Sequence, residues 1–447
     1  MRYLISFLVA FAASALIGRF LIPWLHALKA GQSIKEIGPV WHMAKQGTPT
    51  MGGIMFIAGI FIAILVTGWK DFSQGRFGAL FVFLFALVFG VIGFLDDFMK
   101  VKYHKNEGLP ASQKFLLQLA AAIVFTVLLR YTGYLTPDLY IPFFNVSFQL
   151  PWAVYMVFAA FVIVATVNAV NLTDGVDGLA TGVTLPVALF YLVVSLMWKV
   201  TDLSIFAAAL VGGLCAFLIY NFHPAKVFMG DTGSLFLGGT VCGLAFALDI
   251  PLIIVLVGII YLLETLSDII QVTYFKLTHG KRIFRMAPLH HHFEMGGWSE
   301  EKLFTVFTLA PVVVAFVLSF TEYNMLQPPR FVFMANYIRM FLEDNVFLTA
   351  VSNTLKIAVV IGPVSYMLCF FIAWVINDLK PAARAFLTAL FYIPTVVGGA
   401  AWAVWRLLLS GDQYGLLNNL LMSVGIIYEP MAWLTEETTI LPVLIIV

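Results

Sequence analysis

Residues 77–97 read FGALFVFLFALVFGVIGFLDD, an apolar run that ends on two adjacent carboxylates. The run carries no charge up to Leu95 and has the length of ~20 residues that a helix needs to cross a bilayer. The whole chain has the same character, because 61% of its 447 residues are hydrophobic and only 11% are charged. Soluble domains are about 45–50% apolar and about 25% charged. The sequence therefore predicts a polytopic membrane protein and excludes a disordered chain.

Comparable apolar runs recur along the chain. Because lipid offers no partners to backbone polar groups, open sheets cannot span it, and the predicted fold class is all-α. Ten runs lie before residue 321, near 3–24, 51–69, 77–95, 115–133, 152–170, 179–198, 203–220, 234–249, 251–275 and 303–320. Two more follow, near 354–376 and 386–408, and a last run, 440–447, begins and is cut off by the end of the chain.

Lysine and arginine predict the orientation. The loops after runs 1, 3, 5, 7 and 9 hold thirteen of them, against five on the opposite side. Cytoplasmic loops carry the excess of positive charge, so these loops should be cytoplasmic and the N-terminus outside. A cleaved signal peptide ending at Ala13-Ser14-Ala15 is the less favoured alternative, because the apolar run continues through Ile22.

Two overall properties exclude other classes. Twenty-five basic against twenty-four acidic residues give no electrostatic case for a nucleic-acid partner. All three cysteines lie in apolar runs, so no disulfide framework is expected.

The first charged cluster is Asp96 and Asp97 with Lys100. Adjacent carboxylates repel each other unless a cation lies nearby. The pair suits a metal ligand or a general base. Taken alone, a solvated helix end with Asp96 and Lys100 as an i,i+4 pair is slightly favoured.

The second cluster is the stretch NAVNLTDGVDG at residues 168–178. Asn168, Asn171 and Asp174 recur every three residues and would share one helix face. Gly175 and Gly178 would end the helix and allow the backbone to approach a ligand closely. A polar helix end with Asx turns is the alternative. Two Asn and two Asp side chains at the end of a membrane span cost free energy unless they have hydrogen-bond partners. This favours a functional role for the cluster.

The third cluster, residues 221–234, reads NFHPAKVFMGDTGS. Its glycine-rich end resembles a helix N-terminus that favours anions. Asp231 is either a helix cap or a hard oxygen ligand for Mg²⁺ beside a phosphate. Phe228 could stack on a base, although packing is slightly favoured.

The fourth cluster is MAPLHHHFE at residues 286–294, preceded by Lys281, Arg282 and Arg285. Consecutive histidines do not share a helix face, so we expect a loop that lines a pocket for a phosphorylated ligand. The alternative is a surface loop or adventitious metal binding. Glu264, Asp268 and Gln271 in run 9 share one face and line the same pocket or satisfy neighbouring helices.

These clusters all fall on the predicted cytoplasmic side. Carboxylate pairs, glycine-rich turns and basic loops together favour Mg²⁺-assisted phosphoryl chemistry at the lipid boundary. A P-loop, a zincin motif and a G-x-S-x-G motif are absent from the sequence, so ATP hydrolysis within this chain is not expected.

Five blocks taken in order resemble the phospho-N-acetylmuramoyl-pentapeptide transferase family, of glycosyltransferase family 4 type. The blocks are residues 38–53, 96–100, 171–180, 228–234 and 286–294, and the likeness covers about residues 1–309. It implies that the chain lies in a bacterial inner membrane, with its active site on the cytoplasmic face and a possible homodimer.

The resemblance also implies a reaction. Undecaprenyl phosphate would attack the β-phosphate of UDP-MurNAc-pentapeptide, releasing UMP and forming lipid I for peptidoglycan synthesis. A GlcNAc-1-phosphate transferase on the same lipid is the nearest alternative, and residues 286–294 fit the MurNAc-pentapeptide branch better. A direct reaction and a phospho-enzyme on Asp97 or Asp231 both stay open.

The same likeness assigns roles to individual residues. Asp231 would bind Mg²⁺ with support from Asp174, while Asp96 and Asp97 orient or deprotonate the lipid phosphate. His290 completes the catalytic set. The implied uridine contacts are Asn171, Gly175, Asp177, Asn221 and Phe228, and the further implied substrate contacts are Lys45, Thr50, Lys100, Lys114, Asn168, Gln271, His290, His291 and His292.

The likeness ends after about Leu309. Residues 310–447 resemble the N-terminal half of an ABC sugar-transporter permease, through motifs such as Asn353-Thr354-Leu355 and Phe391-Tyr392-Ile393-Pro394. The tenth span, to about residue 320, would be a hybrid. The segment lacks later spans and a coupling loop, so we expect no ABC ATPase partner and favour a merged gene, a truncated fusion or an engineered chain. A transporter subunit and a scaffold are the competing function classes.

Overall fold

The computed structural model describes residues 2–28, 45, 47–103, 108–141, 146–322, 330–377, 379–381, 383–388, 405–436, 439 and 443. Contacts divide the chain into two compact units, Met1–Phe331 and Val332–Val447. Most of the predicted first loop, much of run 12 and nearly all of the last run lie outside the described residues.

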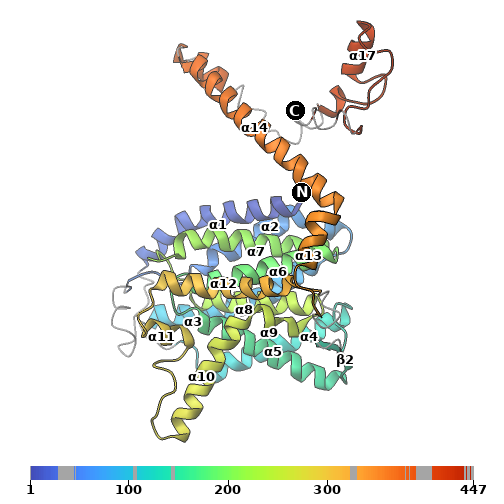
Figure 1. Ribbon diagram of the computed structural model, residues 1–447. Coiled ribbons are helices and arrows are strands. Elements are labelled where there is room, and N and C mark those ends of the chain that lie inside the picture. Colours follow the sequence, from blue (N-terminus) through green and yellow to red (C-terminus); the bar gives the residue numbers. More distant parts are fainter. Residues whose placement is uncertain are drawn as a thin grey trace. The chain divides into compact units, whose positions relative to one another are not determined.

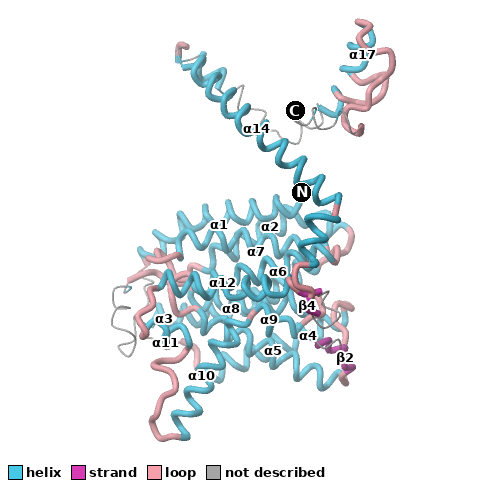
Figure 2. The backbone as a smooth tube through the Cα atoms, viewed as in Figure 1, coloured by secondary structure: helices cyan, strands magenta, loops and turns pink. Residues whose placement is uncertain are grey.

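The first unit is a bundle of long helices (Figure 1), and the few strands are short (Figure 2). Two small hairpins pair β1 (Asp138–Ile141) with β2 (Val146–Gln149) and β3 (Thr321–Glu322) with β4 (Arg330–Phe331). The all-α prediction is therefore confirmed. The helices are α1 (Arg2–Ala27), α2 (Gly53–Ser73), α3 (Gly78–Tyr103), α4 (Ala111–Tyr131), α5 (Trp152–Thr173), α6 (Leu179–Met197), α7 (Thr201–Asn221), α8 (Gly230–Ala247), η2 (Pro251–Ile253), α9 (Ile254–Val257), α10 (Ile259–Leu277), α11 (Leu289–Glu294) and α12 (Glu300–Ser319).

All ten predicted spans of this unit fall on helical residues, although α8, on which the eighth lies, is not among the helices long and apolar enough to cross a membrane. Among the described residues, α1 to α7 and α12 are long and apolar enough to cross a membrane. The ninth run is broken, because Pro251–Val257 and Ile259–Leu277 meet at an angle of 82°. Helix α10 consequently leans out of the bundle in Figure 1.

Helix α8 forms the centre of the bundle. Every residue from Thr232 to Ala247 is buried, and α8 packs on α2, α3, α5 and α6. Small residues let helix backbones approach closely in membranes. A Cβ atom at Gly93 of α3 would lie 2.0 Å from the carbonyl oxygen of Asp231, so only glycine fits there. This contact fixes the start of α8 against the end of α3.

The buried charges of the bundle gather at its two ends. At one end Asp71 is fully buried and pairs with Arg2 at 2.7 Å and Arg76 at 2.9 Å. At the other end, where α11 lies in Figure 1, α3 and α5 finish and α2, α8 and α12 begin. All four sequence clusters lie at this second end, which is therefore the candidate site.

The second unit holds one long helix, α14 (Asn345–Asn377), which is long and apolar enough to span a membrane. Shorter elements are α13 (Ala335–Ile338), a π-helical turn η3 (Arg339–Glu343) and α17 (Leu416–Ser423). The amide of Asn418 organises its last part, because Oδ1 accepts from Trp433 Nε1 at 2.7 Å and Nδ2 donates to Met431 O at 3.0 Å.

Candidate active site

The carboxylate of Asp97 caps the N-terminus of α8. Asp97 Oδ2 accepts the Thr232 backbone N–H at 2.9 Å and the Thr232 hydroxyl at 2.8 Å, and Oδ1 accepts the Asp231 N–H at 3.2 Å. The first N–H groups of a helix have no partner within the helix and favour negative charge. The glycine-rich motif thus does bind an anion, and that anion is a side chain of α3.

The side chain of Asp231 does not cap its own helix. Its Oδ2 lies 3.0 Å from Lys100 Nζ and 2.8 Å from Lys114 Nζ, and its Oδ1 accepts from Asn171 Nδ2 at 2.8 Å. Four helices, α3, α4, α5 and α8, supply these groups. Of the two interpretations of Asp231 that the sequence left open, the cap is the wrong one, and the carboxylate faces an electropositive site.

Asp96 faces the same cations from the other side. Its Oδ1 accepts the Leu109 N–H at 2.8 Å, and its Oδ2 pairs with Lys100 and lies 4.0 Å from Lys114 Nζ. Asp96 and Asp97 are each 3% exposed. The i,i+4 pair with Lys100 is present, but it belongs to a buried network rather than to a solvated helix end.

Asp96, Asp97 and Asp231 each offer one oxygen, and these oxygens lie within 4.8 Å of one another. Three carboxylate oxygens are the hard ligands that Mg²⁺ prefers. The donor set therefore fits a divalent cation, and Lys100 and Lys114 lie beside it as partners for phosphate oxygens.

Asp174 lies next to this triad but outside it. It follows the last residue of α5, and its side chain makes no hydrogen bond or ion pair with the described residues. Removal from water raises the pKa of the Asp174 carboxyl well above its ordinary value, and the charges of Asp231 and Asp97 raise it further. A carboxyl that holds a proton is suited to donating a hydrogen bond.

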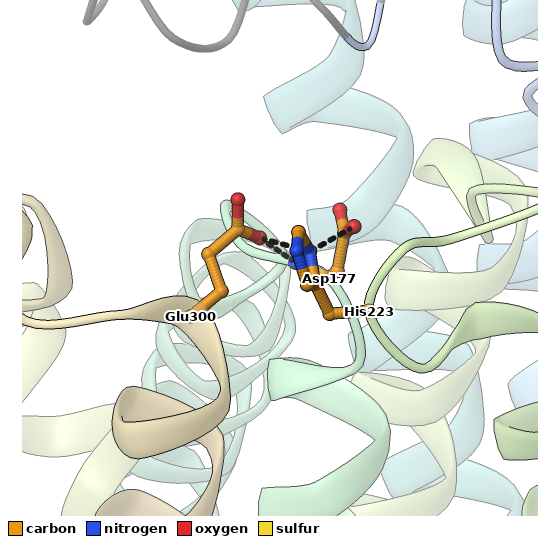
Figure 3. A group of neighbouring side chains, drawn as sticks. All are labelled: Asp177, His223 and Glu300. Atoms are coloured by element: carbon orange, nitrogen blue, oxygen red, sulfur yellow. Dashed lines mark hydrogen bonds and ion pairs between the residues drawn. The ribbon is translucent and has the colours of Figure 1, made fainter.

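A second network surrounds Asp177, between α5 and α6 (Figure 3). His223 Nδ1 lies 3.0 Å from Asp177 Oδ2 and 3.5 Å from Glu300 Oε2. Lys45 Nζ bonds to Asp177 Oδ1 at 2.7 Å and to Glu300 Oε2 at 2.6 Å. Three acid or imidazole groups here could hold a metal by geometry, but the ammonium of Lys45 already bonds to both carboxylates.

The histidines of the fourth cluster lie in the short helix α11, not in the loop that we expected. Pro288 precedes the helix and starts it, and three consecutive side chains then point in different directions. His290 is buried and faces Glu264, His291 pairs with Glu294 at 2.9 Å, and His292 Nδ1 accepts from the Arg285 N–H at 3.1 Å.

Thr50 and Phe228 lie where two chain segments join at the start of α2 and α8. The Phe228 N–H donates to Pro49 O at 2.9 Å, and its carbonyl accepts from the Gly52 N–H at 2.8 Å. A Cβ atom at Gly230 would lie 2.6 Å from Thr50 Oγ1 and 2.5 Å from Asp97 Oδ2, so Thr50 borders the carboxylate triad.

Three predicted substrate contacts already have partners within the fold. Asn168 donates to Gln118 Oε1 at 2.7 Å, Asn221 bonds to Thr181 and to the Val227 carbonyl, and Gln271 binds the backbone of residues 283–284. Each amide therefore shapes the site by holding two elements together.

Sequence reasoning did not select His223, Glu300, Thr232 or Ser234 as site residues, and it gave Glu264 only as a residue that lines the histidine pocket or satisfies neighbouring helices. Glu300 follows the capping residue Ser299 in the first turn of α12, where an acidic residue has a local explanation. Only the fold brings it to Asp177 and His223, 123 and 77 positions away in sequence.

Comparisons with known proteins show which family the chain resembles. Residues 79–249 match the model of glycosyl transferase family 4, and residues 45–57 match signature 1 of phospho-N-acetylmuramoyl-pentapeptide-transferase. A phospho-N-acetylmuramoyl-pentapeptide-transferase of Clostridium acetobutylicum is 49% identical over 314 residues, covering 70% of this chain and 96% of that protein. Proteins of the same name are 47% identical in Carboxydothermus hydrogenoformans, over 70% of this chain and 95% of theirs, and 45% identical in Caldanaerobacter subterraneus, over 71% and 97%.

Proposed function

The chain belongs to the phospho-N-acetylmuramoyl-pentapeptide transferase family, and we propose that Asp96, Asp97 and Asp231 form the centre at which it acts. It is a multi-pass membrane transferase that moves phospho-MurNAc-pentapeptide from UDP-MurNAc-pentapeptide to undecaprenyl phosphate, giving lipid I and UMP. The observation that carries the assignment of the centre is the convergence of the buried Asp96 and Asp97, the half-buried Asp231 and two lysines at one end of the bundle.

The residues of this centre would hold Mg²⁺ through Asp231, with Asp96 and Asp97 beside it. When bound, the ion would neutralise the diphosphate and make UMP a better leaving group. Phosphoryl transfer depends mainly on positioning and on charge stabilisation. Lys100 and Lys114 supply fixed positive charge within hydrogen-bond distance of Asp231, where the phosphates of the substrate would lie.

Asp97 and Asp96 have different surroundings, which supports different roles. Asp97 receives three hydrogen bonds from the start of α8, so its oxygens are held in fixed positions. Asp96 uses one oxygen on the Leu109 N–H and the other on Lys100. We assign Asp97 to the metal and to orientation of the lipid phosphate, and Asp96 to acceptance of its proton.

The network of Lys45, Asp177, His223 and Glu300 is assigned to the nucleotide end of the donor. Asp177 also accepts the Ala225 N–H at 3.0 Å, so the loop before α8 is fixed to the loop before α6. If the bound donor displaced Lys45 from Asp177 and Glu300, the Lys45 ammonium would be free to pair with a phosphate of the donor. His291 and His292, which follow His290 on α11 and are half-buried, are assigned to the muramoyl end.

The assay that tests this proposal measures UMP release from purified chain in lipid with undecaprenyl phosphate and Mg²⁺. UDP-MurNAc-pentapeptide is expected to react, and UDP-GlcNAc is expected to react at most weakly. Preference for UDP-GlcNAc would identify a GlcNAc-1-phosphate transferase on the same lipid carrier. Product formation only with substrate added on the cytoplasmic side of oriented vesicles would support the predicted orientation.

The boundary between transferase and tail is proposed near Leu309, within α12. Phe304 and Thr308 contact Gly182 of α6, and Leu303 and Phe307 are buried. The described side chains of α12 beyond Pro311 are not buried, with Val313 56% and Phe316 59% exposed. This change supports a hybrid helix whose first half is native to the bundle. Mass spectrometry of the mature C-terminus would show whether residues beyond 320 are present in the cell.

A further inference from the structure

The imidazole of His290 is buried against a carboxylate of another helix. His290 Nδ1 lies 3.0 Å from Glu264 Oε2, and the His290 backbone N–H donates to the same oxygen at 3.3 Å. His290 is 1% exposed and Glu264 is fully buried. The backbone N–H is a fixed donor to this oxygen, and a carboxylate can only accept. With a carboxylate at Glu264, the ring proton would lie on Nδ1.

The other ring nitrogen has no partner in the described part of the chain. His290 Nε2 is buried and makes no hydrogen bond there. A buried polar atom without a partner costs about 1–3 kcal/mol, and such an atom in a native fold calls for an explanation. One explanation is a ligand that forms the missing hydrogen bond with His290 Nε2.

The direction of Nε2 identifies where that ligand lies. A Cβ atom at Gly175 would lie 2.2 Å from Nε2, so the ring reaches the backbone directly after Asp174. Asp174 in turn lies close enough to Asp231 and Asp97 to feel their charges. The unpaired nitrogen thus lies at the corner that Asp174 and Gly175 form after α5.

We infer that Glu264 is a positioning residue for the transfer reaction. It holds the proton on His290 Nδ1 and fixes the ring, so that Nε2 meets the diphosphate–sugar part of the bound donor at the Asp174–Gly175 corner. The bend of 82° that separates α9 from α10 brings the first turns of α10, and with them Glu264, to α11. The nature of the ligand rests on the proposed function, whereas the tautomer and the ring position rest on geometry alone.

A double-mutant cycle tests the inference. Glu264→Gln keeps the shape and removes the charge, and we expect kcat to fall about 10- to 100-fold, as for other residues that orient a functional histidine. KM is expected to change less than about threefold. In the His290→Asn background, Glu264→Gln is expected to have less than a twofold further effect, because Glu264 acts only through His290. Full additivity of the two losses would overturn the inference.

Thr265→Val is the matched control. Thr265 is the next residue of α10, and its hydroxyl has no hydrogen-bond partner in the described structure. Its removal should leave kcat within twofold of the parent. Glu264→Asp, which restores a carboxylate, should recover part of the loss. Failure of both Glu264 variants to fold would make Glu264 a structural residue and contradict the inference.

A spectroscopic readout separates this inference from the proposed function. In ¹⁵N-histidine-labelled chain, with eight histidines, the His290 signals are those lost in His290→Asn. They are expected to show a protonated Nδ1, and Glu264→Gln is expected to shift them or to mix both tautomers. A proton on Nε2 alone in the parent would overturn the inference. Absence of lipid I formation with the expected tautomer would overturn only the proposed function.

Discussion

Asp97 and Thr232 lie 135 positions apart, and the carboxylate of the first accepts both the backbone N–H and the hydroxyl of the second. The bond from the Thr232 N–H caps the N-terminus of α8. Both bonds from Thr232 fix the Asp97 carboxylate, which offers an oxygen within 4.8 Å of oxygens of Asp96 and Asp231. The hydrogen bonds from Thr232 to Asp97 therefore both cap α8 and position a carboxylate of the site.

The first prediction concerns Asp97→Asn. The amide can still accept from Thr232, so the loss of the charge should cost no more than about 2 kcal/mol of stability. Activity should fall about 10²-fold or more, since the variant cannot serve as a carboxylate ligand to the metal. Thermal unfolding and lipid I formation measure the two effects.

Asp202→Asn provides the control for that experiment. Asp202 is a buried carboxylate that caps the start of α3, with Oδ2 2.9 Å from the Gly78 N–H, at the opposite end of the bundle. Its stability loss should match that of Asp97→Asn, with turnover retained. Equal losses of turnover in the two variants would show that Asp97 acts only on the fold.

The second prediction concerns pH. Because the pKa of Asp174 is raised in the folded chain above its ordinary value of 3.8, the folded state takes up a proton, and this contribution to stability is lost as pH rises through the higher pKa. Asp174→Asn should therefore unfold at a higher temperature than the parent at pH 8, with the difference shrinking toward pH 4. Melting curves without divalent cations measure it, and a difference independent of pH would contradict it.

The third prediction concerns Gly175→Ala. The new methyl group would lie 2.2 Å from His290 Nε2, so the ring must leave its position. We expect at least about a 10-fold loss of kcat, consistent with the cost of misplacing a reacting group by about 1 Å. The same change at Gly362, where no atom lies within 4 Å, should have no effect. In a His290→Ala background, Gly175→Ala should lower kcat little further. A further large loss of kcat there would show that Gly175→Ala does not act through the His290 ring.

The fourth prediction concerns the network of Figure 3. Lys45→Met removes the ammonium that bonds to Asp177 and Glu300. If this network binds the nucleotide end, KM for the UDP-linked donor should rise about 10-fold, corresponding to ~1.4 kcal/mol, with a smaller change in kcat. Lys302→Met, which removes a lysine packed on Trp298, is the control and should leave KM unchanged. A loss confined to kcat would exclude a binding role.

Much of the fold could be predicted from the sequence, because apolar runs of membrane length report directly on helices. The same scarcity of charge singled out Lys100 and Asp231 as site residues, whereas Lys114 was assigned through the family resemblance. The break before α10 could not be predicted, since Gly258 lies inside one continuous apolar run. Nor could the helix of His290, because six residues after a proline give too short a pattern. A pocket shared by Glu264 and the histidines was one of two interpretations of the sequence, but the pairing of Glu264 with His290 depends on helix packing, which one sequence does not encode locally.

The most direct test of the central claim is lipid I formation by Asp231→Asn in lipid with Mg²⁺. The amide keeps the size of the side chain and can still bond to Asn171, so the variant should fold and melt close to the parent. It loses the anionic oxygen that lies within reach of Asp96, Asp97 and both lysines. The account predicts that UMP release and lipid I formation fall to background in a folded protein. Near-parental turnover by Asp231→Asn would contradict it.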